Sequence, residues 1–193
     1  SLEIKGDRLA RNVRHIDSAH SHSGMILRDN VYGTLEEDVD RRDFTVNALY
    51  YTVQNFLVHD YVNGMEDLEQ RQLKMIGDPE QRYREDPVRI LRALRLSAKL
   101  KFDIEAKTAA PIKPLAHLLE SIPAARLFDE ILKLFFTGNS LETYQSLCRY
   151  EVFRYLFPAS AAEVETNPAA GKLLDLAFTS TDRRIAELKS VNP

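Results

Sequence analysis

The sequence predicts an α+β fold that is predominantly α-helical, and two observations lead to this class. Residues 56–62 have the composition of a β-strand and end at the turn pair Asn63-Gly64. From Pro79 onward, apolar residues recur at helical spacing almost without interruption. The 193 residues are 44% hydrophobic and 28% charged, which suffices for one ordinary core or two small ones.

The first third of the chain predicts mixed structure. Residues 1–30 combine charged and small residues without helical or strand period, so we expect a loop or a frayed entry there. A helix is expected next, because apolar and aromatic residues recur through this segment at Phe44, Val46, Leu49, Tyr50 and Val53. The strand at 56–62 follows this helix.

A helix is predicted to begin at Asp86-Pro87, because Asp is a good N-cap and proline is tolerated in the first helical turn. At 100° per residue it has an apolar face and a basic face. The apolar face should meet a core and the basic face an open cleft. The apolar residues are Ile90, Leu91, Leu94 and Ala98, and the basic residues are Arg89, Arg92, Arg95 and Lys99.

The remaining chain predicts four more helices joined by short connections. Gly138 is placed to stop the second of them, and residues 159–170 are small and polar, which indicates a mobile connection. The stripe of apolar and aromatic residues over 127–157 is interpreted as helical core. The four helices are expected over 106–119, 123–136, 141–150 and 171–188.

Charge and hydropathy limit the function classes. The net charge of −3 argues against a general coating for nucleic acid, but residues 82–101 are locally basic, which suits a confined phosphate-facing site. No apolar run approaches the roughly 20 residues of a membrane span, and no signal sequence is visible, so we expect a cytoplasmic protein. His15, His20 and His22 fit no zinc spacing and are interpreted as loop residues.

Asp86 and Arg89 form the first candidate site. Three residues apart on a helix, they offer an acceptor and a fork of donors along one edge. This edge complements adenine and cytosine, which present an amino donor beside a ring-nitrogen acceptor, and each wrong base would cost about 1–3 kcal/mol. The alternative is a surface ion pair of roughly 0.2–0.5 kcal/mol with an ordinary helix cap.

The second candidate site is the segment from Arg41 to Asn47. Asp43 and Asn47, four residues apart on the expected helix, could bind a ribose hydroxyl or help to hold a metal-bound phosphate. Arg41 and Arg42 could neutralise a triphosphate, because guanidinium binds phosphate oxygens in pairs. The alternative is an ordinary helix cap preceded by solvated arginines.

Together these segments resemble the class II tRNA nucleotidyltransferase and bacterial poly(A) polymerase family. Residues 41–47 match its Arg-Arg-Asp-Phe-Thr-x-Asn motif, and residues 85–92 match its Glu-Asp-x-x-Arg-x-x-Arg motif. The resemblance covers roughly residues 24–157. Two further motifs are matched by Asp60, Gly64, Asp67 and Leu68, and more weakly by Ser121, Arg126 and Glu130.

Within the family, the segment Leu27–Gly33 followed by Glu36-Glu37-Asp38 is typical of the poly(A) polymerase branch. The resemblance implies adenylyl transfer from ATP to RNA 3′ ends with two magnesium ions at the reaction centre. It implies that Asp43 is an active-site carboxylate near ribose and metal. Arg42, Asn47, Asp86, Arg89 and Arg92 would bind the nucleotide, and Arg95 and Lys99 are weaker candidates for RNA contact. Protein partners are not predicted.

The family's Gly-rich loop with Asp-x-Asp is expected before these motifs and is absent. Asp38-Val39-Asp40 has the spelling of this motif but no Gly-rich loop before it, so we reject it as the metal site. We therefore expect a fragment that is inactive alone. It would contain the end of a nucleotidyltransferase head (1–77), a helical neck and body with the base-reading helix (78–158), and a linker with the start of a further helical body (159–193). The alternatives are a CCA-adding tRNA nucleotidyltransferase and a non-catalytic helical RNA-binding module.

Overall fold

The structure is a computed structural model that describes residues 35–191. The first part of this range folds into short elements around two small sheets. Predictions that fall on residues 1–34 therefore lie outside the described residues, including the loop at 1–30, the three histidines and the segment Leu27–Gly33. The short elements are α1 (Leu35–Arg41), the 3-10 turn η1 (Thr45–Asn47), β1 (Leu49–Thr52), β2 (Leu57–Asp60), α2 (Gly64–Glu69) and β3 (Gln72–Leu73).

Strands β1 and β2 form an antiparallel hairpin in which Leu49 pairs with Asp60 and Thr52 with Leu57. The strand predicted at 56–62 is thus confirmed as the shorter β2, and Asn63 beyond it has the left-handed φ of 61° expected of a turn. The helix predicted through Phe44 to Val53 is wrong. The segment 49–52 is rich in aromatic residues and ends in threonine, which favour a strand with a pairing partner.

The second sheet joins the first part of the chain to the helices. Strand β3 pairs in parallel with β4 (Asp103–Ile104), and a bridge between Phe44 and Met75 extends this contact. These strands are too short to show an alternation of apolar and polar residues, so the sequence pattern does not predict them. They fix the segment around Phe44 against the chain that follows α4.

Helices α3 (Pro79–Glu85) and α4 (Val88–Leu100) are consecutive. Asp78 caps α3 by accepting a hydrogen bond from the Gln81 N–H at 3.0 Å. Asp86 ends α3, and its Oδ1 accepts from the Val88 N–H at 3.2 Å, so the predicted helix start at Asp86-Pro87 is confirmed to within one residue. The four apolar residues predicted for the core face of α4 are all buried.

The single helix predicted over 106–119 is wrong as a continuous element. The chain forms α5 (Ala106–Ala109), α6 (Ile112–Leu115) and the 3-10 turn η2 (Ala116–Ser121) instead. Pro111 and Pro114 explain the break, because proline lacks the N–H that a helix interior requires and its ring collides with the preceding turn.

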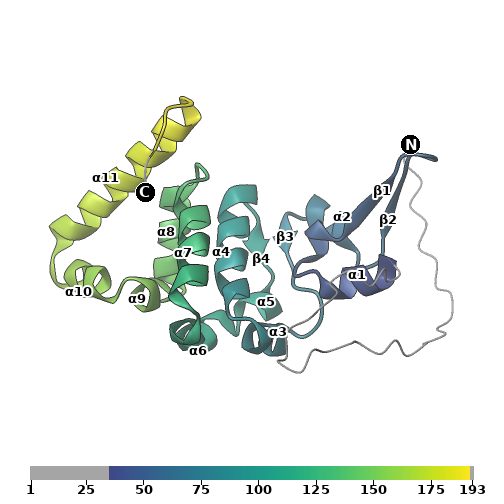
Figure 1. Ribbon diagram of the computed structural model, residues 1–193, viewed down its shortest axis with the longest axis horizontal. Helices are drawn as coiled ribbons and strands as arrows, with labels where there is room; N and C mark the ends of the chain where they lie inside the picture. Colours follow the sequence, from purple (N-terminus) through teal and green to yellow (C-terminus); the bar gives the residue numbers. More distant parts are fainter. Residues whose placement is uncertain (1–34, 192–193) are drawn as a thin grey trace, which may run out of the picture.

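The next two helices agree with prediction. They are α7 (Ala124–Phe135) and α8 (Ser140–Arg149), followed by the short α9 (Phe153–Leu156). Gly138 lies between α7 and α8 with a φ of 85°, a conformation that glycine adopts without strain. Helices α4, α7 and α8 pack against one another and form the centre of the helical part (Figure 1).

The mobile connection predicted at 159–170 is wrong, because most of it is helical. Helix α10 (Pro158–Thr166) and helix α11 (Pro168–Ala186) each have proline in the first turn, where its missing N–H costs nothing. The alanines that made the segment look small are the best helix formers. The helix predicted at 171–188 is confirmed but begins earlier.

The main core runs along the helices from Phe44 and Met75 to Val152 and Phe153. It crosses position 77, so residues before and after the expected head boundary share one core. The molecule is elongated, with the β1–β2 hairpin at one end and α10 and α11 at the other (Figure 1). Among the described residues, none of the helices has the length and apolar content that a membrane span needs.

Candidate nucleotide-binding site

The segment from Asp43 to Asn47 is an extended turn fixed by backbone hydrogen bonds. The Thr45 N–H donates to the Lys74 carbonyl at 3.0 Å, and the Ile76 N–H donates to the Asp43 carbonyl at 2.9 Å. Phe44, fully buried between them, anchors the turn in the core. Asp43 and Asn47 therefore do not share a helix face, but the turn still directs both toward one pocket.

Helix α2 supports this turn from behind. Asp60 accepts from the N–H groups of Gly64 and Met65, each at 2.9 Å, and so caps the helix. The Thr45 hydroxyl donates to buried Asp67 at 2.7 Å. A Cβ on Gly64 would lie 2.3 Å from the Thr45 carbonyl oxygen, so only glycine allows this approach. The third predicted motif therefore has a structural role here.

Arg42 is held by three neighbours. Its Nε and Nη2 donate to Asp38 Oδ2 at 3.1 and 3.0 Å, and Nη1 donates to the Asn47 carbonyl at 2.5 Å. Its guanidinium carbon lies 4.8 Å from the centre of the Tyr50 ring, within cation–π range. The Tyr50 hydroxyl also donates to Asp38 Oδ2. The side chain of Arg42 is nevertheless 40% exposed.

Asp43 connects the turn to α4. Its carboxylate is only 6% exposed and faces two arginines: Arg89 Nε donates to Oδ1 at 2.8 Å, and Arg92 Nη1 lies 2.7 Å from Oδ2. The Arg92 contact is an ion pair without hydrogen-bond geometry. A buried carboxylate requires such compensation, since an unpaired charge at this depth would cost several kcal/mol, roughly. Asp43 therefore orients two of the predicted nucleotide ligands.

Arg89 is further restrained by α3. Its Nη1 donates to the Arg82 carbonyl at 2.9 Å and to Glu85 at 3.3 Å. Arg82 in turn donates from Nη2 to the Arg42 carbonyl at 2.7 Å. A guanidinium has five N–H groups. Within the described part of the chain, these bonds use the Nε and Nη1 donors of Arg89 and leave Nη2 for another acceptor.

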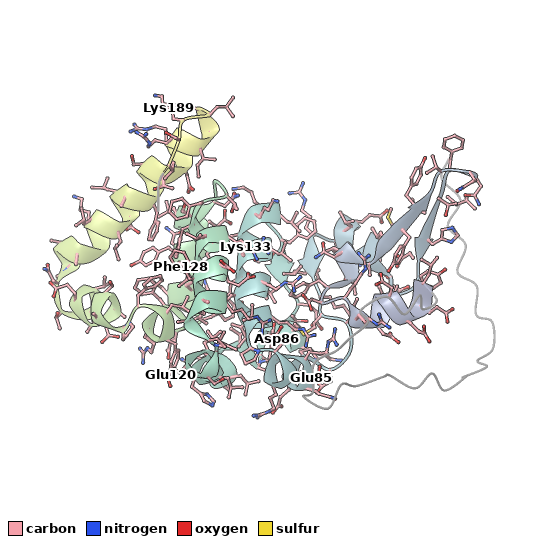
Figure 2. The ribbon with its side chains drawn as sticks, in the orientation of Figure 1. Glu85, Asp86, Glu120, Phe128, Lys133 and Lys189 are labelled. Atoms are coloured by element: carbon pink, nitrogen blue, oxygen red, sulfur yellow. The ribbon has the colours of Figure 1, made fainter. Side chains whose placement is uncertain are left out.

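Asp86 does not pair with Arg89. Its Oδ2 accepts from Arg126 Nη2 of α7 at 2.7 Å, while its Oδ1 caps α4. Figure 2 places Glu85 and Asp86 together where α3 gives way to α4. The predicted base-reading residues are thus oriented separately, Asp86 by α7 and Arg89 by Asp43. Each carboxylate oxygen has a second lone pair, so Asp86 keeps acceptor capacity.

A pocket of about 450 Å³ opens beside Asp43. Three of its five lining residues are arginines and one is a carboxylate, so its field favours an anionic ligand. Among the predicted nucleotide ligands, Arg89 contacts the lining residue Asp43 without lining the pocket itself, and Asp86 is not part of the lining. The lining residues are Arg41, Arg42, Asp43, Asn47 and Arg92.

The residues described here do not fit a metal site. Over 35–191, no three His, Cys, Asp or Glu side chains lie close enough to hold a metal ion. The Asp43 carboxylate faces two guanidinium groups, which compete with a cation for its oxygens. Asp38, which was rejected as part of a metal motif, binds Arg42 and Tyr50. The geometry therefore favours arginine orientation over metal ligation for Asp43.

The weaker candidates lie farther along α4. Lys99 is exposed, and Arg95 is half-buried with an Nε that has no hydrogen-bond partner among the described residues. Neither lines the pocket. Of the weak motif, Arg126 alone reaches the site, because Ser121 bonds the Leu118 carbonyl and Glu130 bonds Lys133.

Sequence reasoning missed the residues that orient the predicted ligands. Asp38 lies four residues before Arg42, a spacing that indicates an ion pair, and this signal could have found it. Tyr50 and Arg82 had no such signal, because their contacts depend on the hairpin and on the packing of α3. Arg126 was noted only as part of a weak motif, and its contact with Asp86 joins residues 40 positions apart.

Two family models match the chain. The model described as "Poly A polymerase head domain" matches residues 3–74. The model described as "Probable RNA and SrmB- binding site of polymerase A" matches residues 101–163. Helix α4 and the segment predicted to read the base lie between the two matched regions.

Curated relatives give the same assignment. The chain is 50% identical to Poly(A) polymerase I of Salmonella typhi over 178 residues, covering 91% of this chain and 38% of that protein. It is 50% identical to Poly(A) polymerase I of Haemophilus influenzae, covering 95% and 41%. The CCA-adding enzyme of Streptococcus thermophilus is 39% identical over 83% of this chain and 41% of its own length. The chain thus spans about two fifths of these relatives.

Solved structures share the fold. The CCA-adding enzyme of Bacillus stearothermophilus in complex with CTP has a TM-score of 0.62 and 31% identity, covering 71% of this chain and 34% of that one. A tRNA nucleotidyltransferase complexed with a primer tRNA and an incoming ATP analog has a TM-score of 0.58 and 33% identity, covering 64% and 37%.

Proposed function

Because the chain belongs to the family of bacterial poly(A) polymerases and tRNA nucleotidyltransferases, we propose that it contributes nucleotide recognition to template-independent adenylyl transfer from ATP to RNA 3′ ends. The poly(A) polymerase relatives support adenylation most directly, with 50% identity over 91% of the chain against 39% over 83% for a CCA-adding relative.

The observation that carries this proposal is the pocket of three arginines beside the Asp43–Arg89 ion pair. Arg42 and Arg92 are 40% and 41% exposed and line the pocket, so both can reach phosphate oxygens. Asn47 is exposed at the same wall and offers an amide to a ribose hydroxyl. The arrangement suits a nucleoside triphosphate with its phosphates against the arginines.

Base reading falls to Asp86 and Arg89. Arg89 keeps Nη2 donors free for the N1 acceptor of adenine, and Asp86 keeps acceptor capacity for the N6 amino group. Guanine presents the reverse order along this edge and would leave both protein groups unpaired. Such mismatches cost about 1–3 kcal/mol each, enough to select a base without a template.

Adenylyl transfer also involves metal ions and the RNA substrate, in addition to the nucleotide contacts described above. The two magnesium ions that the resemblance implies would supply activation of the attacking hydroxyl and charge stabilisation of the pyrophosphate oxygens, but the residues described over 35–191 do not fit a site for them. Asp43 has a positioning role here, holding Arg89 and Arg92. RNA would approach along the basic face of α4, past Arg95 and Lys99, toward residues 101–163. We retain the division into head (1–77), neck and body (78–158) and the start of a further helical body (159–193) as part of the proposal, without the linker expected in the last part, because helices α10 and α11 occupy most of it.

CCA addition is the second candidate function, since cytosine presents the same donor and acceptor order as adenine to Asp86 and Arg89. A structural neighbour in complex with CTP favours it. Primer extension by the product of the complete gene, with ATP or CTP on RNA, separates the two. We expect efficient incorporation of AMP and little of CMP. Efficient CMP incorporation would instead support the CCA-adding function.

A non-catalytic RNA-binding module is the alternative from another class. Thermal unfolding of the 193-residue chain with and without ATP tests it, together with RNA binding by Asp86→Ala. We expect ATP to raise the Tm in wild type and to have a weaker effect in Asp86→Ala. If ATP does not stabilise the wild type and Asp86→Ala binds RNA normally, the non-catalytic module gains support.

A further inference from the structure

Arg42 is held by a set of contacts that includes residues outside the motif at 41–47. Asp38 lies one turn before Arg42 and accepts two hydrogen bonds from its guanidinium. Tyr50, from strand β1, places its ring beside the guanidinium carbon and donates its hydroxyl hydrogen to the same Asp38 oxygen. The Asn47 carbonyl accepts a third bond. Helix α1, turn η1 and strand β1 therefore each contribute one contact to a single arginine. We call Asp38 and Tyr50 the Arg42 clamp.

The clamp leaves Arg42 able to bind a ligand. Three of the five guanidinium N–H groups make these hydrogen bonds, and Arg42 still lines the pocket beside Arg92. The guanidinium carbon lies over the Tyr50 ring, 4.8 Å from its centroid, and this contact further restrains the side chain. An arginine fixed in this way loses less conformational entropy on binding than a free one.

The clamp contributes little to folding. Asp38 and Arg42 form an exposed i,i+4 pair with side chains 49% and 40% exposed, and ion pairs of this class contribute little to stability because water screens them. Its principal effect is therefore on the direction of Arg42. The hydrogen bonds from Tyr50 and Arg42 lower the pKa of Asp38, so the carboxylate stays charged at neutral pH. Burial and the bond to Asp38 raise the pKa of Tyr50, so it keeps the proton that it donates.

We propose that Asp38 and Tyr50 are positioning residues that hold Arg42 against the phosphates of the incoming nucleoside triphosphate. This inference rests on the proposed function and adds two residues to it. Neither residue touches the ligand: Asp38 acts by fixing the guanidinium, and Tyr50 acts through both its ring and its hydroxyl. The clamp should therefore affect phosphate binding and leave base reading by Asp86 and Arg89 unchanged.

Binding measurements on the 193-residue chain test the clamp. Asp38→Asn removes the charge and Tyr50→Phe removes the hydroxyl, while Asp40→Asn on the same helix and Tyr51→Phe on the same strand are exposed control variants. Calorimetric titration gives Kd for ATP, tripolyphosphate and adenosine. We expect Asp38→Asn to weaken ATP and tripolyphosphate about tenfold, Tyr50→Phe to weaken them less, and the controls to match wild type.

Three readouts separate positioning from a structural defect. The Tm of each variant should stay within about 2 °C of wild type, as expected for loss of a surface ion pair. The Kd for adenosine should not change. In the product of the complete gene, Asp38→Asn should raise the KM for ATP with little change in kcat, because the lost contact acts in binding.

The outcomes distinguish the clamp from the proposed function. If wild type binds ATP and all variants bind it equally well, the clamp is overturned and the proposed function stands. If the variants lose adenosine and ATP in equal proportion, the phosphate role is wrong. If wild type binds neither ATP nor tripolyphosphate, both the proposed function and the clamp fail.

Discussion

Asp43 shows how a buried carboxylate can orient other residues of the candidate site. Its motif suggested a catalytic carboxylate, yet the structure buries it between Arg89 and Arg92. The same principle holds for Asp86, whose carboxylate is oriented by Arg126. At this scale, charged residues work in pairs because a carboxylate in a half-buried cleft needs a cation to compensate for lost hydration.

Asp43→Asn should destabilise the chain by about 2–3 kcal/mol, because Arg89, only 14% exposed, would lose the nearer and more buried of its two carboxylate partners and keep only Glu85. Chemical denaturation measures the change in free energy of unfolding. Glu80→Gln is the matched control, since it removes an exposed i,i+4 pair with Arg84 and should cost no more than about 0.5 kcal/mol. Equal effects of the two variants would contradict the buried ion pair.

At the scale of elements, helices are held together by caps supplied from distant segments. Asp182 of α11 accepts from the Ser140 N–H at 2.7 Å, from the Ser140 hydroxyl and from the Leu141 N–H at 3.1 Å, and so caps the start of α8. Phe178, one turn earlier on α11, stacks on Phe135 with centroids 4.7 Å apart. These contacts seat α11 on the helical core.

Asp182→Ala should lower the free energy of unfolding by about 1–2 kcal/mol, because two N–H groups at the start of α8 lose their acceptor, while the Ser140 hydroxyl can still donate to the Phe135 carbonyl. Hydrogen exchange should show faster exchange at Ser140 and Leu141. Asp175→Ala on the same helix serves as the control. Unchanged protection at the start of α8 would show that α11 does not cap it.

At the scale of the whole molecule, one core extends from the turn at Phe44 to the aromatic cluster around Tyr144. The proposed nucleotide site lies on the surface of this core, where the first part of the chain meets α3, α4 and α7. Its residues keep their geometry only while these parts stay packed, so substitutions that disrupt this packing should weaken nucleotide binding as well as stability.

Stability should fall as the pH rises above about 10. Burial raises the pKa of Tyr144 to about 12, with a smaller contribution from Cys148, and burial also raises the pKa of Tyr83. An unfolded tyrosine ionises near pH 10. A raised folded pKa gives a contribution that is complete below pH 10 and is lost as pH approaches 12. Denaturation between pH 8 and 12 measures this, and Tyr144→Phe should flatten the slope. A slope identical to wild type would refute it.

The sequence by itself determined the family, the fold class and the residue types of the site. Those signals are local, because the motif around Asp43, the motif around Asp86 and the amphipathic face of α4 are each written in consecutive residues. For the same reason, turn and cap chemistry predicted both the end of a helix before Gly138 and the start of α4.

Tertiary structure decided the rest. It made a strand of residues 49–52 because β2 offers a pairing partner. Packing also determines the partners of the site residues. Arg89 pairs with Asp43 and Asp86 pairs with Arg126, and the members of each pair lie about 40 positions or more apart in the chain. Such pairings depend on how distant elements pack, and no spacing along the chain records them.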